Sequence, residues 1–231
     1  MKKMKCFYFT YAGCWSTDFI SDDPVWSNNN IQIICVKYTI RNNMTWTEFI
    51  DDLIDKIIAE IDGDDYILWG HSMGATIAYE VYYELKKRQD LIQPLHVYVS
   101  SGTPPHKIER NLVNVSDECF EQEFIDLGGI RSEILKSEAM LKLTMRTIKR
   151  DIIMLYKYNY EKHMKKMECP LTVLFGSKDK LSRFMYDWNK LPLTDCNNIL
   201  FEGDHFFIFN ILDQFVQIIM RDYEASTMHS G

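Results

Sequence analysis

Short apolar runs alternate with helical patterns along much of this 231-residue chain. The runs are apolar almost throughout rather than at every second position, which is typical of strands buried on both faces. They lie at residues 6–11, 31–38, 66–69, 95–100, 171–175 and 198–201. The clearest helical pattern covers residues 46–61, with a capping box at Thr45 and Glu48 before it and Gly63 placed to end it. This alternation predicts an α/β fold, in which a mostly parallel central sheet is flanked by helices.

The alternation breaks at about residues 104–166, where helical patterns follow one another with no strand pattern between them. A stripe at helical spacing includes Met145, Ile148 and Ile152. We predict one domain over residues 1–231 that carries a helical lid insertion at about 104–166. For any one residue of the stripe, ordinary packing against the core is the alternative.

Composition argues against several classes of function. The chain has 26 basic and 33 acidic side chains and a formal net charge of −7, so no broad basic surface for a phosphate backbone is evident. No run approaches the roughly 20 apolar residues of a membrane span, and none near the start is long enough for a signal sequence. The six cysteines are scattered without metal-ligand spacing, as in a reducing cytosol. We expect a cytoplasmic monomer that binds neither nucleic acid nor membrane and holds no metal.

A G-x-S-x-G motif occupies residues 70–74, directly after one apolar run and directly before a helical pattern. At such a strand-to-helix turn a serine is lifted clear of the sheet, and its flanking residues must be small because strand and helix pass closely. We therefore predict that Ser72 is a nucleophile. The Met73 amide, at the start of the helix, is predicted to stabilise an oxyanion. A glycine-rich turn without catalytic function is the alternative.

A serine nucleophile needs a general base, which in this type of site is a histidine on a loop after a late strand. His205 has that position, between the apolar run at 198–201 and a helical pattern at 207–220. The other histidines adjoin the serine, fall within a strand pattern, lie in or beside the insertion, or belong to the C-terminal tail. They are His71, His96, His106, His163 and His229. We predict His205 as the base.

An acid that orients the histidine is expected between Ser72 and His205, on a loop after a strand. Asp179 closely follows the apolar run at 171–175 and is our prediction. Asp204 is the main rival, although a sequence neighbour seldom reaches the same imidazole ring. Weaker candidates are Asp126 and Asp195.

A second oxyanion donor is expected from the loop after the first strand. Residues 10–14 offer small side chains and free amides there. Ala12 is the predicted donor, and Gly13 is a close alternative.

Taken together, these motifs resemble those of the stand-alone type II thioesterases that accompany nonribosomal peptide and polyketide synthases, which have the α/β-hydrolase fold. The similar segments occur in order along nearly the whole chain. They are residues 11–13, 70–75, 100–106, 124–129, 146–160, 169–171, 176–179, Trp188 and 203–207. The chain departs from the family at Thr10 and Cys14, where proline and glycine are usual, and at 38–41, where a Pro-Gly pair is missing.

The resemblance implies hydrolysis of acyl or peptidyl thioesters carried on the phosphopantetheine arm of carrier proteins, which releases stalled groups. It implies no metal or bound cofactor, because the pantetheine belongs to the partner. An esterase or lipase acting on free esters, or a carrier-binding protein without activity, are the alternatives. Carrier proteins tend to be acidic, so we expect a local basic patch, and its candidate residues are Lys149, Arg150, Lys162, Lys165 and Lys166.

Overall fold

The computed structural model of the protein describes residues 3–14, 16–88, 90–110, 115–130, 132–160, 166–194 and 196–228. Its centre is a six-stranded sheet with strand order β2-β1-β3-β4-β5-β6, in which each neighbouring pair is parallel. The strands are β1 (Met4–Phe9), β2 (Ile31–Cys35), β3 (Tyr66–His71), β4 (Val97–Ser100), β5 (Leu171–Gly176) and β6 (Cys196–Phe201). Each predicted apolar run overlaps one of these strands, and the predicted parallel sheet flanked by helices is confirmed.

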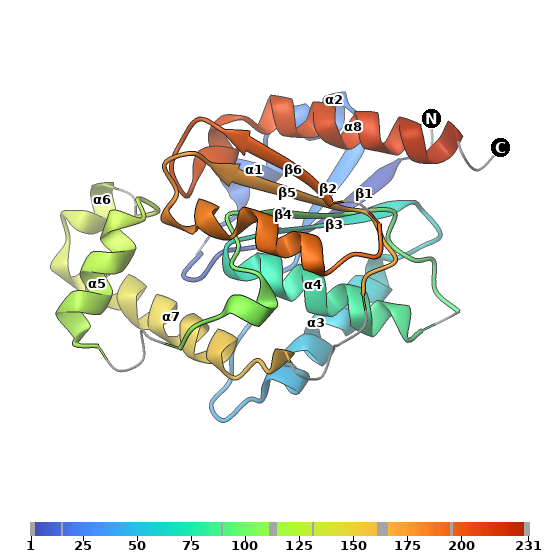
Figure 1. Ribbon diagram of the computed structural model, residues 1–231. Helices are drawn as coiled ribbons and strands as arrows, with labels where there is room; N and C mark the ends of the chain where they lie inside the picture. Colours follow the sequence, from blue (N-terminus) through green and yellow to red (C-terminus); the bar gives the residue numbers. More distant parts are fainter. Residues whose placement is uncertain are drawn as a thin grey trace.

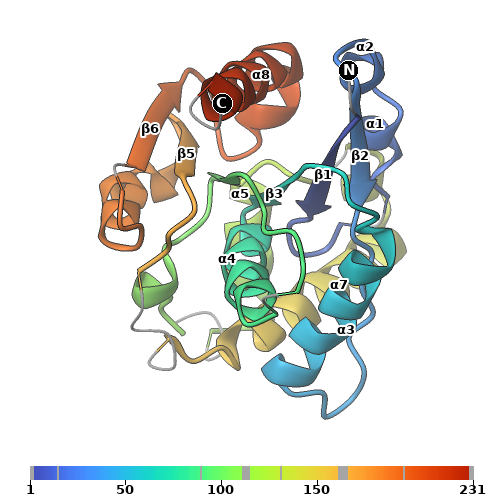
Figure 2. The same ribbon diagram turned by 90° about the vertical axis from the view of Figure 1, so that its right-hand side faces the viewer.

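Helices cover both faces of the sheet, with α3 and α4 on one face and α2 and α8 on the other (Figures 1 and 2). The α-helices are α1 (Asp18–Ser21), α2 (Pro24–Asn28), α3 (Trp46–Glu60), α4 (Met73–Lys86), α5 (Asp117–Asp126), α6 (Ser132–Leu135), α7 (Glu138–Tyr156) and α8 (Leu212–Met228). Shorter 3₁₀ segments are η1 (Pro105–Lys107), η4 (Lys180–Lys190) and η5 (Phe207–Asn210). The capping box of α3 forms as expected, since the Glu48 amide donates to Thr45 Oγ1 at 3.2 Å and Thr45 N–H donates back to the Glu48 carboxylate at 2.8 Å.

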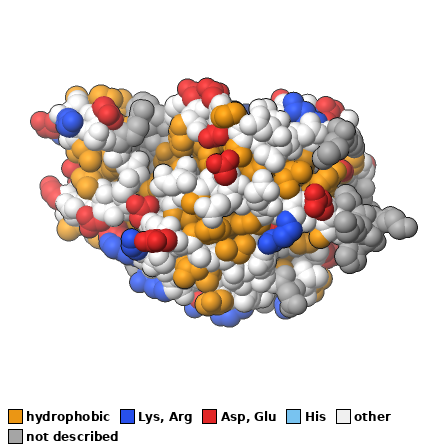
Figure 3. Space-filling model, turned by 90° about the horizontal axis from the view of Figure 1, so that it is seen from above, with side chains coloured by type: hydrophobic (Ala, Val, Ile, Leu, Met, Phe, Trp, Pro, Cys, Tyr) orange, Lys and Arg blue, Asp and Glu red, His pale blue; other side chains and the backbone are white. Residues whose placement is uncertain are grey.

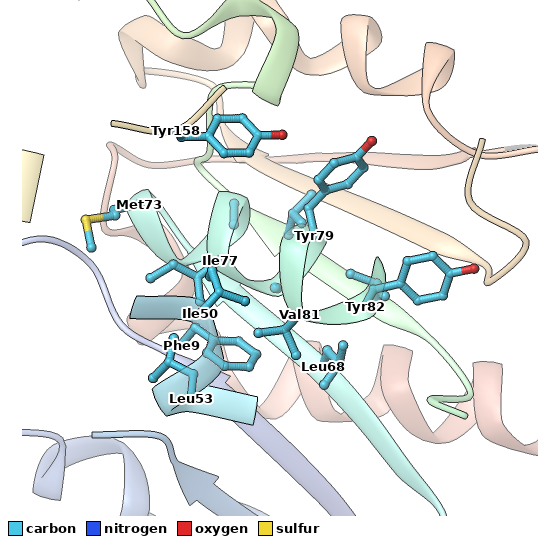
Figure 4. Packing of buried hydrophobic residues seen from close by; sticks show 14 of the residues in the cluster. Phe9, Ile50, Leu53, Leu68, Met73, Ile77, Tyr79, Val81, Tyr82 and Tyr158 are labelled. Carbon is cyan, nitrogen blue, oxygen red and sulfur yellow. The ribbon is translucent and has the colours of Figure 1, made fainter. Parts of the chain in front are cut away.

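The continuous apolar runs are explained by burial on both faces. Along β1, Phe7 points into the core with α3 and α4, while Tyr8 points into the core with α2 and α8. Figure 4 shows the first of these cores, to which Ile77 of α4, Ile50 of α3 and Phe9 of β1 all contribute. Two apolar layers therefore hold the strands in fixed register, which fixes the position of the loops at their carboxyl ends.

The helical pattern at 207–220 proves to be two elements rather than one. The 3₁₀ turn η5 ends at Asn210, and α8 begins only at Leu212. Between them Ile211 has φ −129° and ψ 29°, outside the helical region, so the chain changes direction after burying Phe207 and Ile208.

The helices α5, α6 and α7 lie between β4 and β5 in the chain, in the segment for which a lid insertion was expected. In Figure 1, α5 and α6 stand to one side of the sheet, and α7 runs from them towards α3. The predicted stripe faces inward, because Met145, Ile148 and Ile152 of α7 are buried in the same core as α3 and α4. The stripe therefore packs this insertion against the body of the protein.

Candidate active site

The predicted nucleophile lies in a sharp turn between β3 and α4. Ser72 has φ 56° and ψ −118°, a strained conformation for a residue with a side chain. A Cβ atom at Gly70 would lie 2.0 Å from the Gly74 carbonyl oxygen, and one at Gly74 would lie 2.0 Å from the Phe9 carbonyl oxygen. Both flanking residues must therefore be glycine for strand and helix to pass this closely.

The carboxyl ends of neighbouring strands meet beside this turn. Phe9, the last residue of β1, is level with Gly70, and Ser100 at the end of β4 is level with His71. On the other side, a Cβ atom at Gly176 would lie 2.4 Å from the Gly203 carbonyl oxygen, so the end of β5 and the loop after β6 are also in close contact. This arrangement brings the loops of β1, β5 and β6 towards Ser72.

His205 lies on the loop after β6, where the sequence analysis placed the general base. Its Nε2 atom is 3.0 Å from Ser72 Oγ, and its side chain is buried. Its Nδ1 atom is 3.0 Å from Asp179 Oδ2. With Nδ1–H donating to the carboxylate, Nε2 is left as an acceptor for the serine hydroxyl proton.

Asp179 lies on the loop between β5 and η4 and is only 4% exposed. Its Oδ1 atom accepts from the Leu181 amide at 2.9 Å, which leaves Oδ2 for the imidazole of His205. Burial alone raises the pKa of the Asp179 carboxyl, but the interactions with His205 and the Leu181 amide outweigh burial, so that its pKa lies below the ordinary value. The carboxylate is therefore ionised at neutral pH.

The two rival acids that the structure describes, Asp204 and Asp126, make no hydrogen bond to the imidazole of His205. Asp204 turns away from the ring, because its carboxylate accepts from the Phe206 amide at 2.8 Å. Asp126 accepts from the side chain of Gln122 at 2.7 Å. Asp195 lies outside the described residues. The structure thus brings Ser72, His205 and Asp179 together among the predicted candidates.

The other histidines that the structure describes make no hydrogen bond to Ser72. His71 is fully buried, and its Nδ1 atom is 2.9 Å from Ser100 Oγ. Burial, reinforced by the neighbouring His205, holds the pKa of His71 well below its ordinary value. His96 contacts Thr172 Oγ1 at 2.9 Å, away from the active site. His163 and His229 lie outside the described residues.

Two backbone amides beside Ser72 have no acceptor among the described residues. Met73 begins α4, so its N–H group has no intrahelical partner. Ala12 lies in the tight turn after β1, and its amide is likewise left free by the described part of the chain. The alternative donor Gly13 is occupied, since its N–H donates to Asp151 Oδ2 at 2.8 Å. The geometry therefore favours Ala12 over Gly13.

Asp151 was not singled out in the sequence analysis, although a signal for it exists. It sits on α7 between Ile148 and Ile152, so an acidic side chain interrupts the apolar stripe at helical spacing. The side chain is buried, and Tyr38 Oη also donates to it at 3.3 Å. A buried carboxylate needs such partners, which single-sequence periodicity does not supply.

Two cavities meet at Ser72 and His205. The first has a volume of about 480 Å³ and is lined mainly by apolar side chains from the insertion and from the loops after β1 and β6. They include Phe19, Phe124, Ile130, Ile148, Phe206 and Phe209. The second has a volume of about 360 Å³ and lies between the insertion and η4. Its lining is also mainly apolar, and its charged side chains are Lys107, Lys180, Arg183, Glu109 and Glu123. Ser72 can thus be approached by a substrate with two arms, one in each cavity.

The part of the chain that the structure describes has neither a metal-ligand cluster nor a membrane-spanning helix. Within it, no group of histidine, cysteine and acidic side chains has the arrangement of a metal site. Nor is any described helix both long enough and apolar enough to span a bilayer.

Residues 24–227 match the model of the thioesterase domain family. The gramicidin S biosynthesis protein GrsT of Aneurinibacillus migulanus is 23% identical over 234 aligned residues, covering 95% of this chain and 88% of GrsT. The medium-chain S-acyl fatty acid synthase thioesterase of Rattus norvegicus is also 23% identical, over 88% of this chain and 81% of that protein. Among solved structures, ClbQ from the colibactin NRPS/PKS pathway has a TM-score of 0.85 at 21% identity, covering 98% of this chain and 99% of ClbQ. Because the family model spans most of its length, this chain belongs to the thioesterase family, as its sequence motifs predicted.

Proposed function

We propose that this thioesterase hydrolyses acyl or peptidyl thioesters carried on the phosphopantetheine arms of carrier proteins, and so clears stalled groups from nonribosomal peptide or polyketide assembly lines. The observation that carries the proposal is the hydrogen-bonded series Ser72–His205–Asp179, placed where two cavities meet. The pathway names of GrsT and ClbQ support the assembly-line context, and the fatty acid synthase relative supports an acyl thioester substrate.

In the proposed mechanism Ser72 Oγ attacks the thioester carbonyl carbon while His205 Nε2 takes the hydroxyl proton. The amides of Met73 and Ala12 stabilise the oxyanion of the tetrahedral intermediate, and Asp179 stabilises the imidazolium of His205. Collapse of the intermediate breaks the carbon–sulfur bond, and the departing thiolate receives the proton from His205. Water, deprotonated by the same imidazole, then cleaves the acyl-enzyme and restores Ser72. These steps draw on no resident metal or cofactor, since the pantetheine is part of the substrate.

We place the acyl group in the first cavity and the pantetheine arm in the second. Apolar side chains make up most of both linings. The second also contains Lys107, Lys180 and Arg183, cations that suit a phosphate and an acidic carrier, beside Glu109 and Glu123. Such local attraction is needed because the chain as a whole is acidic. Acidic side chains are spread over the described part of the face seen in Figure 3, among hydrophobic ones.

The basic patch predicted on the insertion is a weaker docking candidate. Lys149 forms an ion pair with Asp117 at 2.6 Å, and Arg150 pairs with Asp151 at 3.2 Å, so each cation is partly compensated. Lys166 is exposed, whereas Lys162 and Lys165 lie outside the described residues. Lys107 and Lys180 of the second cavity also have acidic partners, but at the longer distances of 3.9 Å from Asp187 and 3.8 Å from Glu123. Because these ion pairs are longer and the cations lie beside Ser72, the lining of the second cavity is our preferred docking site.

The proposal is tested by comparing kcat/KM for an acyl carrier protein, for the same acyl group on a small thiol, and for its simple oxygen ester. Carrier-protein hydrolysis predicts the highest kcat/KM for the carrier substrate, with a loss at high salt because the docking charges are screened. Lys180→Glu with Arg183→Glu should lower kcat/KM for the carrier substrate alone, and Lys149→Glu serves as the matched control. A preference for the free oxygen ester would instead support an esterase, and turnover by Ser72→Ala would contradict the mechanism.

A further inference from the structure

The carboxylate of Asp151, in the insertion, accepts a hydrogen bond from the loop after β1, which contains the proposed oxyanion donor Ala12. The Gly13 N–H donates to Asp151 Oδ2 at 2.8 Å, and the two residues are 138 positions apart in sequence. Asp151 lies on α7 and is only 1% exposed. The loop after β1 is therefore bound directly to a helix that belongs to the insertion.

The same helix is packed against the loop at the point of this hydrogen bond. Gly13 has φ +81°, and a Cβ atom added there would lie 2.3 Å from Ile148 Cγ1 on α7. The Cys14 amide donates to the Tyr11 carbonyl at 3.3 Å, which closes a tight turn with Gly13 in its third position. A positive φ at this position is what a type II turn requires. The central peptide of this turn joins Ala12 to Gly13, and its N–H group is the one that donates to Asp151.

The carboxylate occupies this place at an energetic cost. Burial raises the pKa of the Asp151 carboxyl, and the hydrogen bonds from Gly13 and Tyr38 and the charge of Arg150 only partly offset burial. The ionised group is thus less favourable here than in water. Because burial disfavours the ionised carboxylate of Asp151, a contribution to folding stability alone does not explain why an acidic side chain stands here.

We infer that Asp151 is a positioning residue that holds the turn at residues 11–14 in the shape that presents the Ala12 amide to the oxyanion. The turn is a single hydrogen-bonded unit, so an acceptor that fixes its central peptide also restricts the amide one residue earlier. Since the acceptor stands on α7, the oxyanion site is complete only when α7 is seated on the body of the protein. This inference rests on the proposed acyl-enzyme chemistry at Ser72.

The test compares Asp151→Asn, which keeps an acceptor oxygen for Gly13, with Asp151→Leu, which fills a similar volume without one. The substrate in this comparison is a thioester of the acyl group with a small thiol, so that recognition of the carrier protein plays no part. We expect Asp151→Leu to lower kcat/KM by about 10- to 100-fold, because a misplacement of about 1 Å can cost 10²-fold. Asp151→Asn should stay within about threefold of the parent, because the acceptor role is retained.

A second readout separates oxyanion positioning from general damage. A trifluoromethyl ketone of the same acyl chain forms a hemiketal with Ser72 whose oxyanion occupies the oxyanion site, whereas the corresponding thioether binds without reacting. Asp151→Leu should weaken ketone binding by the same factor as kcat/KM and leave thioether binding unchanged. Asp151→Ala replaces the leucine variant if the latter does not fold.

Two control variants keep the comparison specific. Tyr38→Phe removes the hydrogen bond that Tyr38 Oη donates to the same carboxylate oxygen, and Lys149→Ala removes an exposed cation from the same helix. Both should retain parental kcat/KM. Equal losses in Asp151→Asn and Asp151→Leu, a parental kcat/KM in Asp151→Leu, or matching losses of ketone and thioether binding would each overturn the inference. A parent enzyme that hydrolyses no acyl thioester would instead defeat the proposed function.

Discussion

Gly74→Ala tests whether the close approach of β1 and α4 holds the active site together. The added methyl group would lie 2.0 Å from the Phe9 carbonyl oxygen and 2.9 Å from that of Thr10, where ordinary contact begins near 3.4 Å. Strand and helix must therefore separate by about 1.4 Å. Because Thr10 leads into the turn that holds Ala12, this movement carries one oxyanion donor away from the other. We expect a loss in kcat/KM of about 10²-fold and a destabilisation of about 1–3 kcal/mol.

The measurements are kcat/KM on a small acyl thioester and the free energy of unfolding from urea titration. Gly63→Ala is the matched control, since Gly63 has φ +91° and an added Cβ atom there meets nothing within 4 Å. That variant should lose about 1 kcal/mol through backbone strain alone and keep its kcat/KM. A Gly74→Ala enzyme with parental activity and stability would refute the argument that tight backbone packing shapes this site.

The remaining predictions concern the acid of the site. Asp179→Asn should lower kcat by about 10³- to 10⁴-fold, because the imidazole tautomer is no longer fixed, whereas Asp204→Asn should stay within about twofold. Steady-state measurement of kcat for both variants tests this prediction. A larger loss in Asp204→Asn than in Asp179→Asn would assign the role of the acid to Asp204. Since the folded-state pKa of Asp179 is lowered, its carboxylate stabilises the fold above the unfolded pKa of about 3.9 and loses this contribution as pH falls. The stability difference between parent and Asp179→Asn should therefore shrink below about pH 4, and urea titrations showing no such change would contradict this.

The sheet and the nucleophile turn could be predicted because their determinants are local in sequence. A strand buried on both faces has an unbroken apolar run in its sequence. The turn at Ser72 requires glycine at positions 70 and 74 because of contacts made by the adjoining strand and helix. The order of strands along the chain then placed Asp179 and His205 on loops at the same edge of the sheet. That their side chains lie within hydrogen-bonding distance could be seen only in the structure.

Features that depend on contacts between distant segments could not be predicted in this way. The choice between Ala12 and Gly13 turned on Asp151, whose position on α7 says nothing by itself about a loop near the start of the chain. Charge patterning likewise located basic residues on the insertion, but not the ion pair between Lys149 and Asp117. The pairing of side chains across separate elements is set by tertiary packing, which periodicity does not encode.

The central claim is that hydrolysis proceeds through an acyl group on Ser72. It is tested most directly by mixing the enzyme with an acyl-loaded carrier protein, stopping the reaction with acid within one turnover, and locating the added mass by peptide mass spectrometry. We predict the acyl mass on the peptide that contains Ser72, and a Ser72→Ala enzyme that carries no such mass and leaves the carrier loaded. An acyl group on another side chain, or a Ser72→Ala enzyme within about tenfold of the parental rate, would contradict the account, because loss of a triad serine costs on the order of 10⁴-fold or more.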